Sequence, residues 1–136
     1  MQESVFQLVG KPRIKKFNFK LSEEYKFDGE LNLDMNNNIQ IGKGVDENAQ
    51  QAIVTLSIGI FESIKTNEVP FTIKIDIEGH FKWNETLEEN GAMLDSMLKQ
   101  NAPAILYSYV RPIITMITVE ANMPPLVIPL MNFQKE

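Results

Sequence analysis

Four segments in the first 80 residues alternate apolar and polar side chains, and this pattern constrains the fold more than any other feature. The alternation covers residues 14–21, 31–41, 53–61 and 71–77. A period of two is typical of strands with one buried face, whereas parallel strands covered on both faces read as continuous apolar runs. The pattern therefore predicts an antiparallel sheet of four strands with one wet face. The Asn36-Asn37-Asn38 run interrupts the second segment as either a bulge in one long strand or a turn, because the parity is the same on both sides.

The pattern changes to a helical period after residue 79. The run Thr86-Leu87-Glu88-Glu89 matches a capping box, in which the Thr86 hydroxyl accepts from the Glu89 amide and the Glu89 carboxylate accepts from the Thr86 amide. A short helix with one apolar stripe is expected to follow. The stripe consists of Met93, Leu94, Met97 and Leu98. It packs either against another subunit or within its own.

Asn101 and Pro103 are suited to start a second helix, with Asn101 as the cap and Pro103 in the first turn, where a missing N–H costs nothing. The β-branched residues between positions 113 and 119 favour a strand by propensity instead. Further along, Pro124, Pro125 and Pro129 predict an extended tail. Strands that precede helices, rather than alternating with them, predict the α+β class.

The length of 136 residues and the 43% hydrophobic composition fit a single domain that spans residues 1–136. The absence of cysteine excludes disulfides and thiolate metal sites and fits a reducing compartment, so we expect a cytoplasmic protein. The N-terminus has no long apolar region of the kind found in secretory signals. The most apolar segment contains Arg111, Pro112 and Glu120 and falls short of about 18–20 clean apolar residues. We therefore expect a soluble protein without membrane insertion.

Charge is distributed unevenly around the net value of −5. Residues 1–20 contain five basic residues and one Glu, whereas residues 21–90 contain five basic and fourteen acidic residues. An acidic middle disfavours nucleic-acid binding, which needs a continuous basic face. The basic residues of the first segment form either a solvated strand face or a surface for an acidic partner.

The sequence contains no recognisable constellation of catalytic or metal-binding residues. His80 is the single histidine, and it has no cysteine and no acidic pair at metal spacing. Ser57 and Ser63 lie outside any G-x-S-x-G elbow. The adjacent pairs Glu23-Glu24 and Glu88-Glu89 are more typical of solvent-facing or capping carboxylates than of an acid–base couple. A glycine-rich phosphate loop is also missing. We expect no enzyme activity, no metal and no cofactor.

The last third of the chain resembles the SecB-type protein-export chaperones. The similarity rests on the pattern P-x-I-L-Y-x-Y-x-R, which starts at Pro103, and on an end that runs from Pro124-Pro125-Leu126 to Asn132-Phe133. A weaker likeness covers residues 52–81. The resemblance implies a four-stranded antiparallel sheet with two C-terminal helices on one face, and hence a helix through residues 113–119 that Pro112 kinks or locally opens. It also implies a dimer of dimers that holds unfolded polypeptides for export without ATP.

A holdase of this kind needs exposed apolar surface that adapts to many sequences, and methionine and aromatic side chains supply it. The SecB-like interpretation places the client groove among the loop after the last strand, the long helix and the tail. The predicted groove residues are Phe81, Trp83, Tyr107, Met123, Leu126 and Ile128. The predicted interface of a homotetramer is formed by Met93, Leu94 and Met97.

In the exporting members of the family, an acidic outer face of the sheet docks the SecA motor. By overlay, the corresponding positions here are Lys16, Lys20 and Lys74, whose charge opposes a basic docking surface. Those members also carry a C-terminal extension that contacts the motor, whereas this sequence ends three residues after Phe133. We therefore expect a SecB-like chaperone with weak SecA docking, whose partners are unfolded clients or a toxin–antitoxin protein.

Two other classes of function fit the same sequence features. One is an oligomeric interaction module without chaperone activity. The other is a small-molecule binder or enzyme, which would have a closed apolar pocket with convergent polar groups instead of an open groove.

Overall fold

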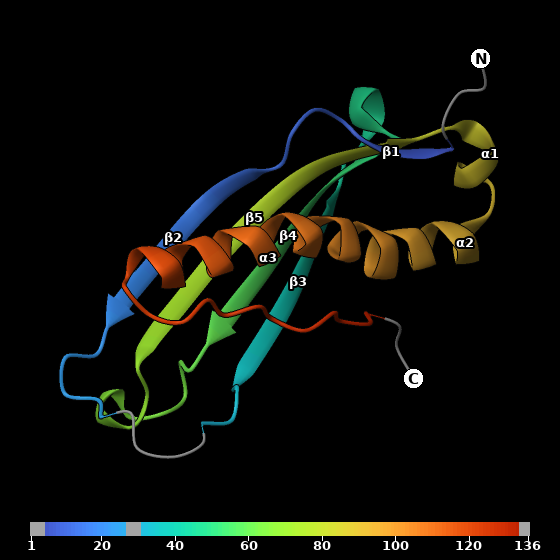
Figure 1. Ribbon diagram of the computed structural model, residues 1–136. Helices are drawn as coiled ribbons and strands as arrows, with labels where there is room; N and C mark the ends of the chain where they lie inside the picture. The colour runs from blue at the N-terminus through green and yellow to red at the C-terminus, as the bar shows by residue number, and fades with distance from the viewer. Residues whose placement is uncertain (1–4, 27–30, 134–136) are drawn as a thin grey trace.

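The computed structural model describes residues 5–26 and 31–133 (Figure 1). The strands within these residues are β1 (Phe6–Leu8), β2 (Arg13–Leu21), β3 (Met35–Lys43), β4 (Gln51–Ile60) and β5 (Phe71–Trp83). The α-helices are α1 (Glu85–Glu88), α2 (Gly91–Ser96) and α3 (Ala102–Glu120), and a π-helical turn, η3 (Met97–Asn101), joins the last two. Two short 3-10 turns lie in the connections, η1 (Asp46–Asn48) and η2 (Thr66–Glu68).

The described strands form one antiparallel sheet, which confirms the predicted α+β class. The order is β1–β5–β4–β3, and β2 also pairs with β5, on the same side as β1. Because β1 lies against residues 81–83 of β5 and β2 against residues 71–78, these two strands share one row. Gly10, with a φ of 72°, and Pro12, which has no N–H to donate, separate them. The sheet thus has the predicted four rows, with one row divided between two strands.

The Asn36-Asn37-Asn38 run is part of a regular strand. Residues 35–43 of β3 pair with residues 52–60 of β4 without a shift in register. The run is therefore neither a bulge nor a turn. The irregular step in the sheet lies in β2, between Ile14 and Lys16.

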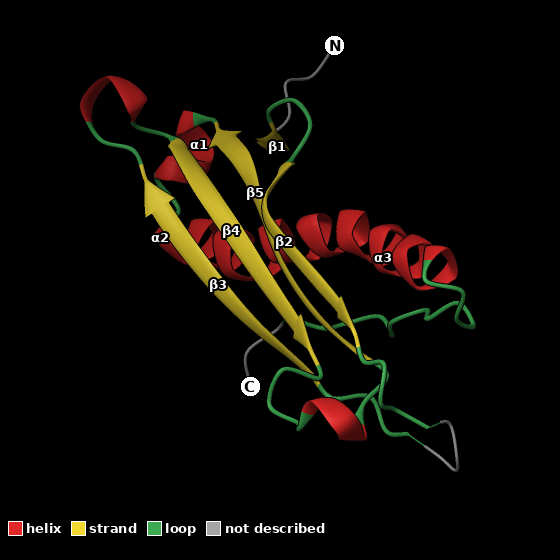
Figure 2. Cartoon of the chain, turned by 90° about the vertical axis from the view of Figure 1, so that its left-hand side faces the viewer, coloured by secondary structure: helices red, strands yellow, loops and turns green. Residues whose placement is uncertain are grey.

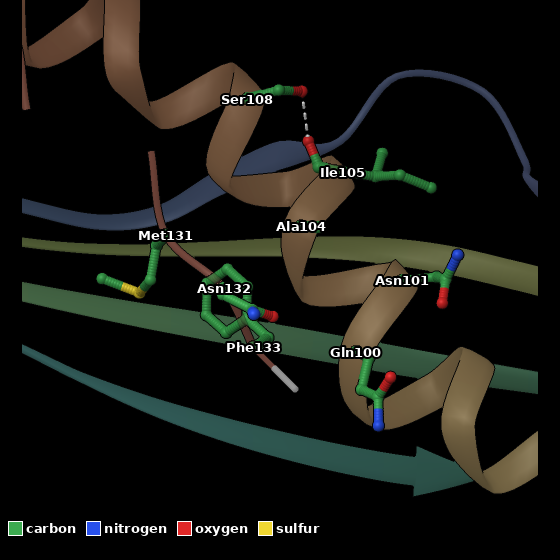
Figure 3. A pocket seen from close by; sticks show the side chains of 8 residues that line it. All are labelled: Gln100, Asn101, Ala104, Ile105, Ser108, Met131, Asn132 and Phe133. Atoms are coloured by element: carbon green, nitrogen blue, oxygen red, sulfur yellow. Dashed lines mark hydrogen bonds between the residues drawn. The ribbon is translucent and has the colours of Figure 1, made fainter. Parts of the chain in front are cut away.

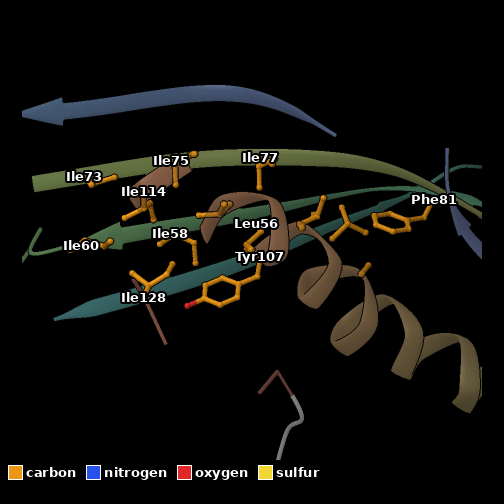
Figure 4. Close-up of a cluster of buried hydrophobic side chains, with 14 of the residues drawn as sticks. Leu56, Ile58, Ile60, Ile73, Ile75, Ile77, Phe81, Tyr107, Ile114 and Ile128 are labelled. Carbon is orange, nitrogen blue, oxygen red and sulfur yellow. The ribbon is translucent and has the colours of Figure 1, made fainter. Parts of the chain in front are cut away.

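The core lies between one face of the sheet and α3. Alternate side chains of β4 and β5 are buried on this face, and the intervening ones are partly exposed on the other. Figure 4 shows the buried set from both strands pointing toward the helix, where Tyr107 and Ile114 meet it. Figure 2 shows that no helix of the described residues crosses the opposite face. We refer to the two faces as the helix face and the outer face of the sheet.

The burial pattern of α3 explains why its β-branched segment is helical. The completely buried side chains of this helix include Leu106, Val110, Ile114 and Thr118. In a strand, Ser108, Pro112 and Met116, which lie halfway between them, would share the same buried face, but these three residues are exposed. The burial pattern therefore matches a helix, and packing on the sheet outweighs the strand propensity of residues 113–119. Gly79 of β5 permits the close approach, because a Cβ at this position would lie 2.9 Å from Cδ2 of Leu106.

The first short helix begins at a different cap from the predicted one. The Asn84 side chain accepts a hydrogen bond from the Leu87 amide at 3.0 Å and caps α1. Thr86 therefore lies inside the helix instead of at its cap, and the predicted capping box is wrong. Asn90 caps α2 in the same manner, by accepting from the Met93 amide at 3.2 Å.

The long helix α3 begins at Ala102 with Pro103 in its first turn, as predicted, but the predicted capping role of Asn101 is wrong. The backbone of Asn101 is already helical, and its side chain makes no capping bond. The chain instead continues from α2 into α3 through the wider turn η3, in which the Ala102 amide donates to the Met97 carbonyl. This turn accommodates Pro103, which has no N–H for the normal helix ladder.

Pro112 lies on an exposed part of α3, and the helix continues on both sides of it. The expected kink or opening thus does not interrupt the helix. Because the proline ring carries no N–H, the carbonyl four residues earlier loses its ladder partner at this point.

The continuous helical stretch Gly91–Glu120 is long and apolar enough to cross a membrane. In this fold, however, the stretch supplies buried side chains to the core under the sheet, among them Leu98, Leu106 and Val110. A core helix of a soluble domain has the same length and composition.

Candidate peptide-binding surface

After α3 the chain reverses and returns along the same helix as an extended tail, residues 123–133 (Figure 1). Asn122 makes the reversal with a φ of 62°, in the left-handed region that asparagine adopts more readily than most residues. Pro124, Pro125 and Pro129 have no N–H, so the tail cannot form a complete strand ladder. Other partners must hold it in place.

Tyr107 and Arg111 of α3 hold the far half of the tail. The Tyr107 hydroxyl donates to the Pro129 carbonyl, and Arg111 Nε donates to the Ile128 carbonyl at 3.0 Å. Burial raises the pKa of the Tyr107 hydroxyl above its ordinary value of 10.0, and the charge of Arg111 opposes part of this rise. The hydroxyl is therefore protonated at neutral pH and serves as a donor. The Phe133 ring packs edge-on against the Tyr107 ring, with centroids 5.8 Å apart.

Two threonines of α3 hold the near half. Thr115 Oγ1 donates to the Leu126 carbonyl at 2.7 Å, and Thr118 Oγ1 accepts from the Leu126 amide at 3.0 Å. Together with Tyr107 and Arg111, these side chains recur every three or four residues and so lie on one face of the helix. Ile128, which lies in the middle of the tail, is completely buried.

An apolar groove with a volume of about 250 Å³ opens between the start of the tail and the end of the sheet. Its lining residues come from the segment before β3, the connection between β4 and β5, the first residue of β5 and the tail. They are Leu31, Leu33, Phe61, Pro70, Phe71, Met123, Pro124, Pro125 and Leu126. The lining contains no charged side chain, and Leu31 and Leu33 are more than one-third exposed. We call this surface the apolar groove.

Hydrogen bonds fix the wall of the apolar groove that precedes β3. The Asp34 carbonyl accepts from the Phe61 amide at 2.8 Å, and the Asp34 carboxylate accepts from the Ser63 hydroxyl at 2.7 Å. These bonds hold Leu33 beside Phe61. The opposite wall is held by the bonds of Thr115 and Thr118 to Leu126 described above.

A row of apolar side chains on β2 continues the apolar groove along the sheet edge. Phe17, Phe19 and Leu21 lie on the helix face, opposite Ile75, Ile73 and Phe71 of β5. The Phe19 and Phe71 ring centroids are 5.8 Å apart. Phe17 is 40% exposed and Leu21 is 45% exposed, whereas α3 packs mainly on β4 and β5. We call these three side chains the β2 row.

A second hollow, of about 490 Å³, lies between the first half of α3 and the end of the tail (Figure 3). It is lined by polar and apolar side chains, among them Gln100, Asn101, Met131 and Phe133. Ser108 points its hydroxyl back to the Ile105 carbonyl of its own helix. This hollow offers hydrogen-bonding groups as well as apolar contact.

The structure places the predicted groove residues in two different environments. Met123 and Leu126 line the apolar groove. The other four, Phe81, Trp83, Tyr107 and Ile128, are buried in the core, none of them more than 7% exposed. They are buried because β1 covers the end of β5, where Phe6 stacks on Phe81 at 5.3 Å and on Trp83 at 6.3 Å, and because the tail covers Tyr107.

The predicted interface stripe is also divided. Leu94 is 5% exposed and belongs to the core, Met97 packs partly against it, and Met93 is 50% exposed. Among the three, Met93 has the largest surface open to another subunit.

The predicted docking lysines lie together on the outer face of the sheet. Lys16 is opposite Asp76 and Lys20 is opposite Thr72, while Asn18 is opposite Lys74. Lys74 Nζ lies 3.9 Å from a Glu62 carboxylate oxygen. This face is open, so its charges are accessible to a partner.

Sequence reasoning missed Leu31, Leu33 and the β2 row. The alternation of apolar residues marked all of them as facing the core. Within residues 5–26 and 31–133, no group of three or more His, Cys, Asp and Glu side chains is arranged to hold a metal ion.

Comparison with known proteins assigns the family. The family model described as preprotein translocase subunit SecB matches residues 14–135. The uncharacterized protein MJ0357 of Methanocaldococcus jannaschii is 29% identical over 119 residues, which cover 88% of this chain and 74% of that protein. The Mycobacterium tuberculosis Rv1957 SecB-like chaperone, solved in complex with a ChAD peptide from the Rv1956 HigA1 antitoxin, has a TM-score of 0.66 at 13% identity, over 93% of this chain and 88% of that one. The last likeness shows a shared fold. Since the family model spans nearly the whole chain, the protein belongs to the SecB family.

Proposed function

We propose that this protein is a chaperone that binds non-native polypeptides without ATP and holds them at the apolar groove. Membership of the non-enzymatic SecB family and the fold shared with a SecB-like chaperone support a chaperone role. The observation that carries the finer proposal is the apolar groove itself, which is open to solvent and continues into the half-exposed β2 row. The expected absence of enzyme activity agrees with the family.

The structure explains how such a surface stays available. A soluble protein rarely keeps a contiguous apolar patch exposed unless the patch binds something. Pro124 and Pro125 stiffen the wall of the apolar groove and prevent the tail from pairing with the sheet edge. Met123 supplies a flexible side chain that repacks around dissimilar guests. The backbone that forms the wall of the apolar groove is thus stiff, whereas the side chains that line it can adapt to different clients.

Light scattering of a chemically unfolded client, diluted into an equimolar amount of the protein without nucleotide, tests the proposal. We expect the wild type to suppress client aggregation. The double variant Leu31→Ser/Leu33→Ser should lose most of this effect, whereas Leu130→Ser, which alters a side chain that is 82% exposed outside the apolar groove, should retain it. Absence of suppression by the wild type across several clients would exclude the chaperone and favour a simple interaction module.

We further propose that the functional assembly is a soluble, cytoplasmic homotetramer. Exposed apolar side chains outside the apolar groove support self-association, among them Met93, Tyr109, Met116 and Val119. Leu94 and Met97 would contribute by supporting the helix that carries Met93. Size-exclusion chromatography with light scattering tests this assembly, and a persistent monomer at micromolar concentration would contradict it.

SecA coupling should be weak in this chaperone, and client segments, including segments of antitoxins, are the partners we propose. Lys16, Lys20 and Lys74 on the outer face repel a basic docking surface. The Rv1957 chaperone, which shares the fold, was solved with a peptide from an antitoxin. Tight, salt-sensitive binding to SecA that Lys74→Glu abolishes would overturn this proposal.

A further inference from the structure

The outer face of the sheet carries a charge opposite to that of the whole protein. Its charged side chains come from β2, from β5 and from the connection after β4. Among the described residues, six of them are basic and three are acidic, which gives this face a net charge of +3 in a chain whose net charge is −5. The basic residues are Arg13, Lys15, Lys16, Lys20, Lys74 and Lys82, and the acidic residues are Glu62, Asp76 and Glu78.

Three of these lysines surround Asn18. Lys16 and Lys20 flank Asn18 along β2, and their Cα atoms are about 13 Å apart at the usual rise of a strand. Lys74 lies opposite Asn18 on β5. A hollow of about 250 Å³ opens at this place. Its polar lining includes Lys16, Asn18, Thr72 and Lys74. We call Lys16, Lys20 and Lys74 the lysine triangle.

Carboxylates of the same subunit leave the lysine triangle largely unpaired. Within residues 5–26 and 31–133, Lys16 and Lys20 make no salt bridge, although Asp76 lies opposite Lys16 in the ladder. Lys74 Nζ lies 3.9 Å from a Glu62 carboxylate oxygen, and both of these side chains are partly exposed. A long, exposed ion pair of this kind is weak. The three ammonium groups are therefore available to carboxylates of a partner.

The lysine triangle is also accessible. No helix of the described residues crosses the outer face (Figure 2). Side chains of a strand project from the faces of a sheet, whereas backbone pairing takes place at its edges, so a strand paired with β2 would leave these lysines exposed. The apolar groove includes Phe71, whose side chain is on the helix face. A partner on the outer face thus leaves the apolar groove free.

The chemistry of the outer face favours an acidic protein segment over a nucleic acid or a membrane. The described strands place no Phe, Tyr or Trp side chain on this face, so bases have no platform to stack on. Three carboxylates lie among the cations and repel a phosphate backbone. Of the exposed large apolar side chains in β2 to β5, Ile53 alone is on this face, which is too little to anchor it in a bilayer.

We infer that the lysine triangle docks an acidic segment of a partner protein, on the opposite side of the sheet from the apolar groove. Carboxylates of the segment lie beside the three ammonium groups, while Asn18 and Thr72 offer hydrogen bonds between them. Complementary charge of this kind selects the partner and speeds its association more than it raises affinity. The partner is therefore a second protein bound in addition to a client.

The probe is a capped eight-residue peptide that alternates Glu and Ser and is labelled for fluorescence anisotropy. A twin peptide has Gln in place of Glu, and neither peptide carries an apolar side chain for the apolar groove. In about 20 mM salt we expect the Glu peptide to bind at least about tenfold more tightly than its twin, because surface charges are weakly screened there. The preference should shrink as the salt concentration rises.

Two matched double variants locate the binding site. Lys20→Gln/Lys74→Gln should reduce the preference for the Glu peptide by at least about fivefold. Lys43→Gln/Lys99→Gln removes the same net charge at two exposed lysines outside the lysine triangle and should leave the preference unchanged. Carbodiimide crosslinking to the wild type needs no variant, and it should join the carboxylates of the peptide to amines of the lysine triangle.

Several results would overturn the inference. They are equal binding of the Glu and Gln peptides, equal losses in the two double variants, and crosslinks only to lysines outside the lysine triangle. Tighter binding of an eight-nucleotide oligothymidylate or of anionic lipid vesicles, lost in Lys20→Gln/Lys74→Gln, would assign the face to another class of partner. A lower oligomeric mass of that variant would show that a second copy of the chain occupies the face.

The apolar groove variant Leu31→Ser/Leu33→Ser separates the two sites. It should bind the Glu peptide as tightly as the wild type does, and weaker binding would place the peptide in the apolar groove and overturn the inference. If the wild type suppresses client aggregation but does not prefer the Glu peptide, the docking inference fails and the chaperone proposal stands. If it prefers the Glu peptide but suppresses no aggregation, the chaperone proposal fails and the docking inference stands.

Discussion

The substitution Ile128→Ala probes the attachment of the tail, which forms one wall of the apolar groove. Ile128 is completely buried beneath α3, and the change removes three carbons from that site. At about 0.8 kcal/mol per buried carbon the transfer loss is about 2.4 kcal/mol, and the cavity left behind brings the total to about 2.5–5 kcal/mol. Leu130→Ala is the matched control, because Leu130 is 82% exposed and its loss should cost less than about 0.5 kcal/mol.

Urea denaturation at one fixed protein concentration, followed by the fluorescence of the single, buried Trp83, measures both effects. Hydrogen exchange of the Leu126 amide, which donates to Thr118 Oγ1, gives a local measurement of the same attachment. In Ile128→Ala this amide should exchange roughly 30-fold faster or more, since about 1.4 kcal/mol corresponds to a factor of ten. Equal, small effects of Ile128→Ala and Leu130→Ala in both measurements would refute the docked tail.

Two other predictions concern the same helix. Burial raises the pKa of the Tyr107 hydroxyl above 10.0 in the folded state. The folded protein therefore keeps this proton at a pH where the unfolded chain has lost it. The stability that this group contributes is complete below pH 10.0 and falls as the pH rises above it. Alkaline titration of the unfolding free energy should therefore be less steep in Tyr107→Phe, and an identical slope would contradict the buried donor. Pro112→Ala restores one backbone donor at an exposed position of α3 and should raise the unfolding free energy by up to about 3 kcal/mol; a loss of stability would show that the proline ring makes a contact that α3 needs.

The sequence predicts the sheet well because a buried face repeats every second residue whatever lies on top of it. Residues 71–77 of β5 and 53–58 of β4 follow this rule without exception. β1 was not predicted, because its three residues are too few to show the alternation of a strand. The π-helical turn that joins α2 to α3 was not predicted either, since such a turn has no pattern of its own in the sequence and Pro103 indicates a separate helix start.

The candidate site was harder to predict than the fold for a different reason. Alternation shows that Phe17 and Leu21 face the helix side of the sheet, but it does not show how far the helix reaches. α3 packs on β4 and β5, so the same apolar pattern is buried on the central strands and half exposed on β2. Conversely, Phe81 and Trp83 were expected in the client groove because nothing in the sequence shows that Phe6 covers them.

Photo-crosslinking of a bound client tests the central proposal most directly. A photoreactive residue replaces Leu33 in the wall of the apolar groove in one variant and Leu130 outside it in another, and each variant is mixed with an unfolded client. We predict strong crosslinking from position 33 and little from position 130, with competition by unlabelled client. Equal crosslinking from both positions, or none from position 33, would contradict a client site in the apolar groove.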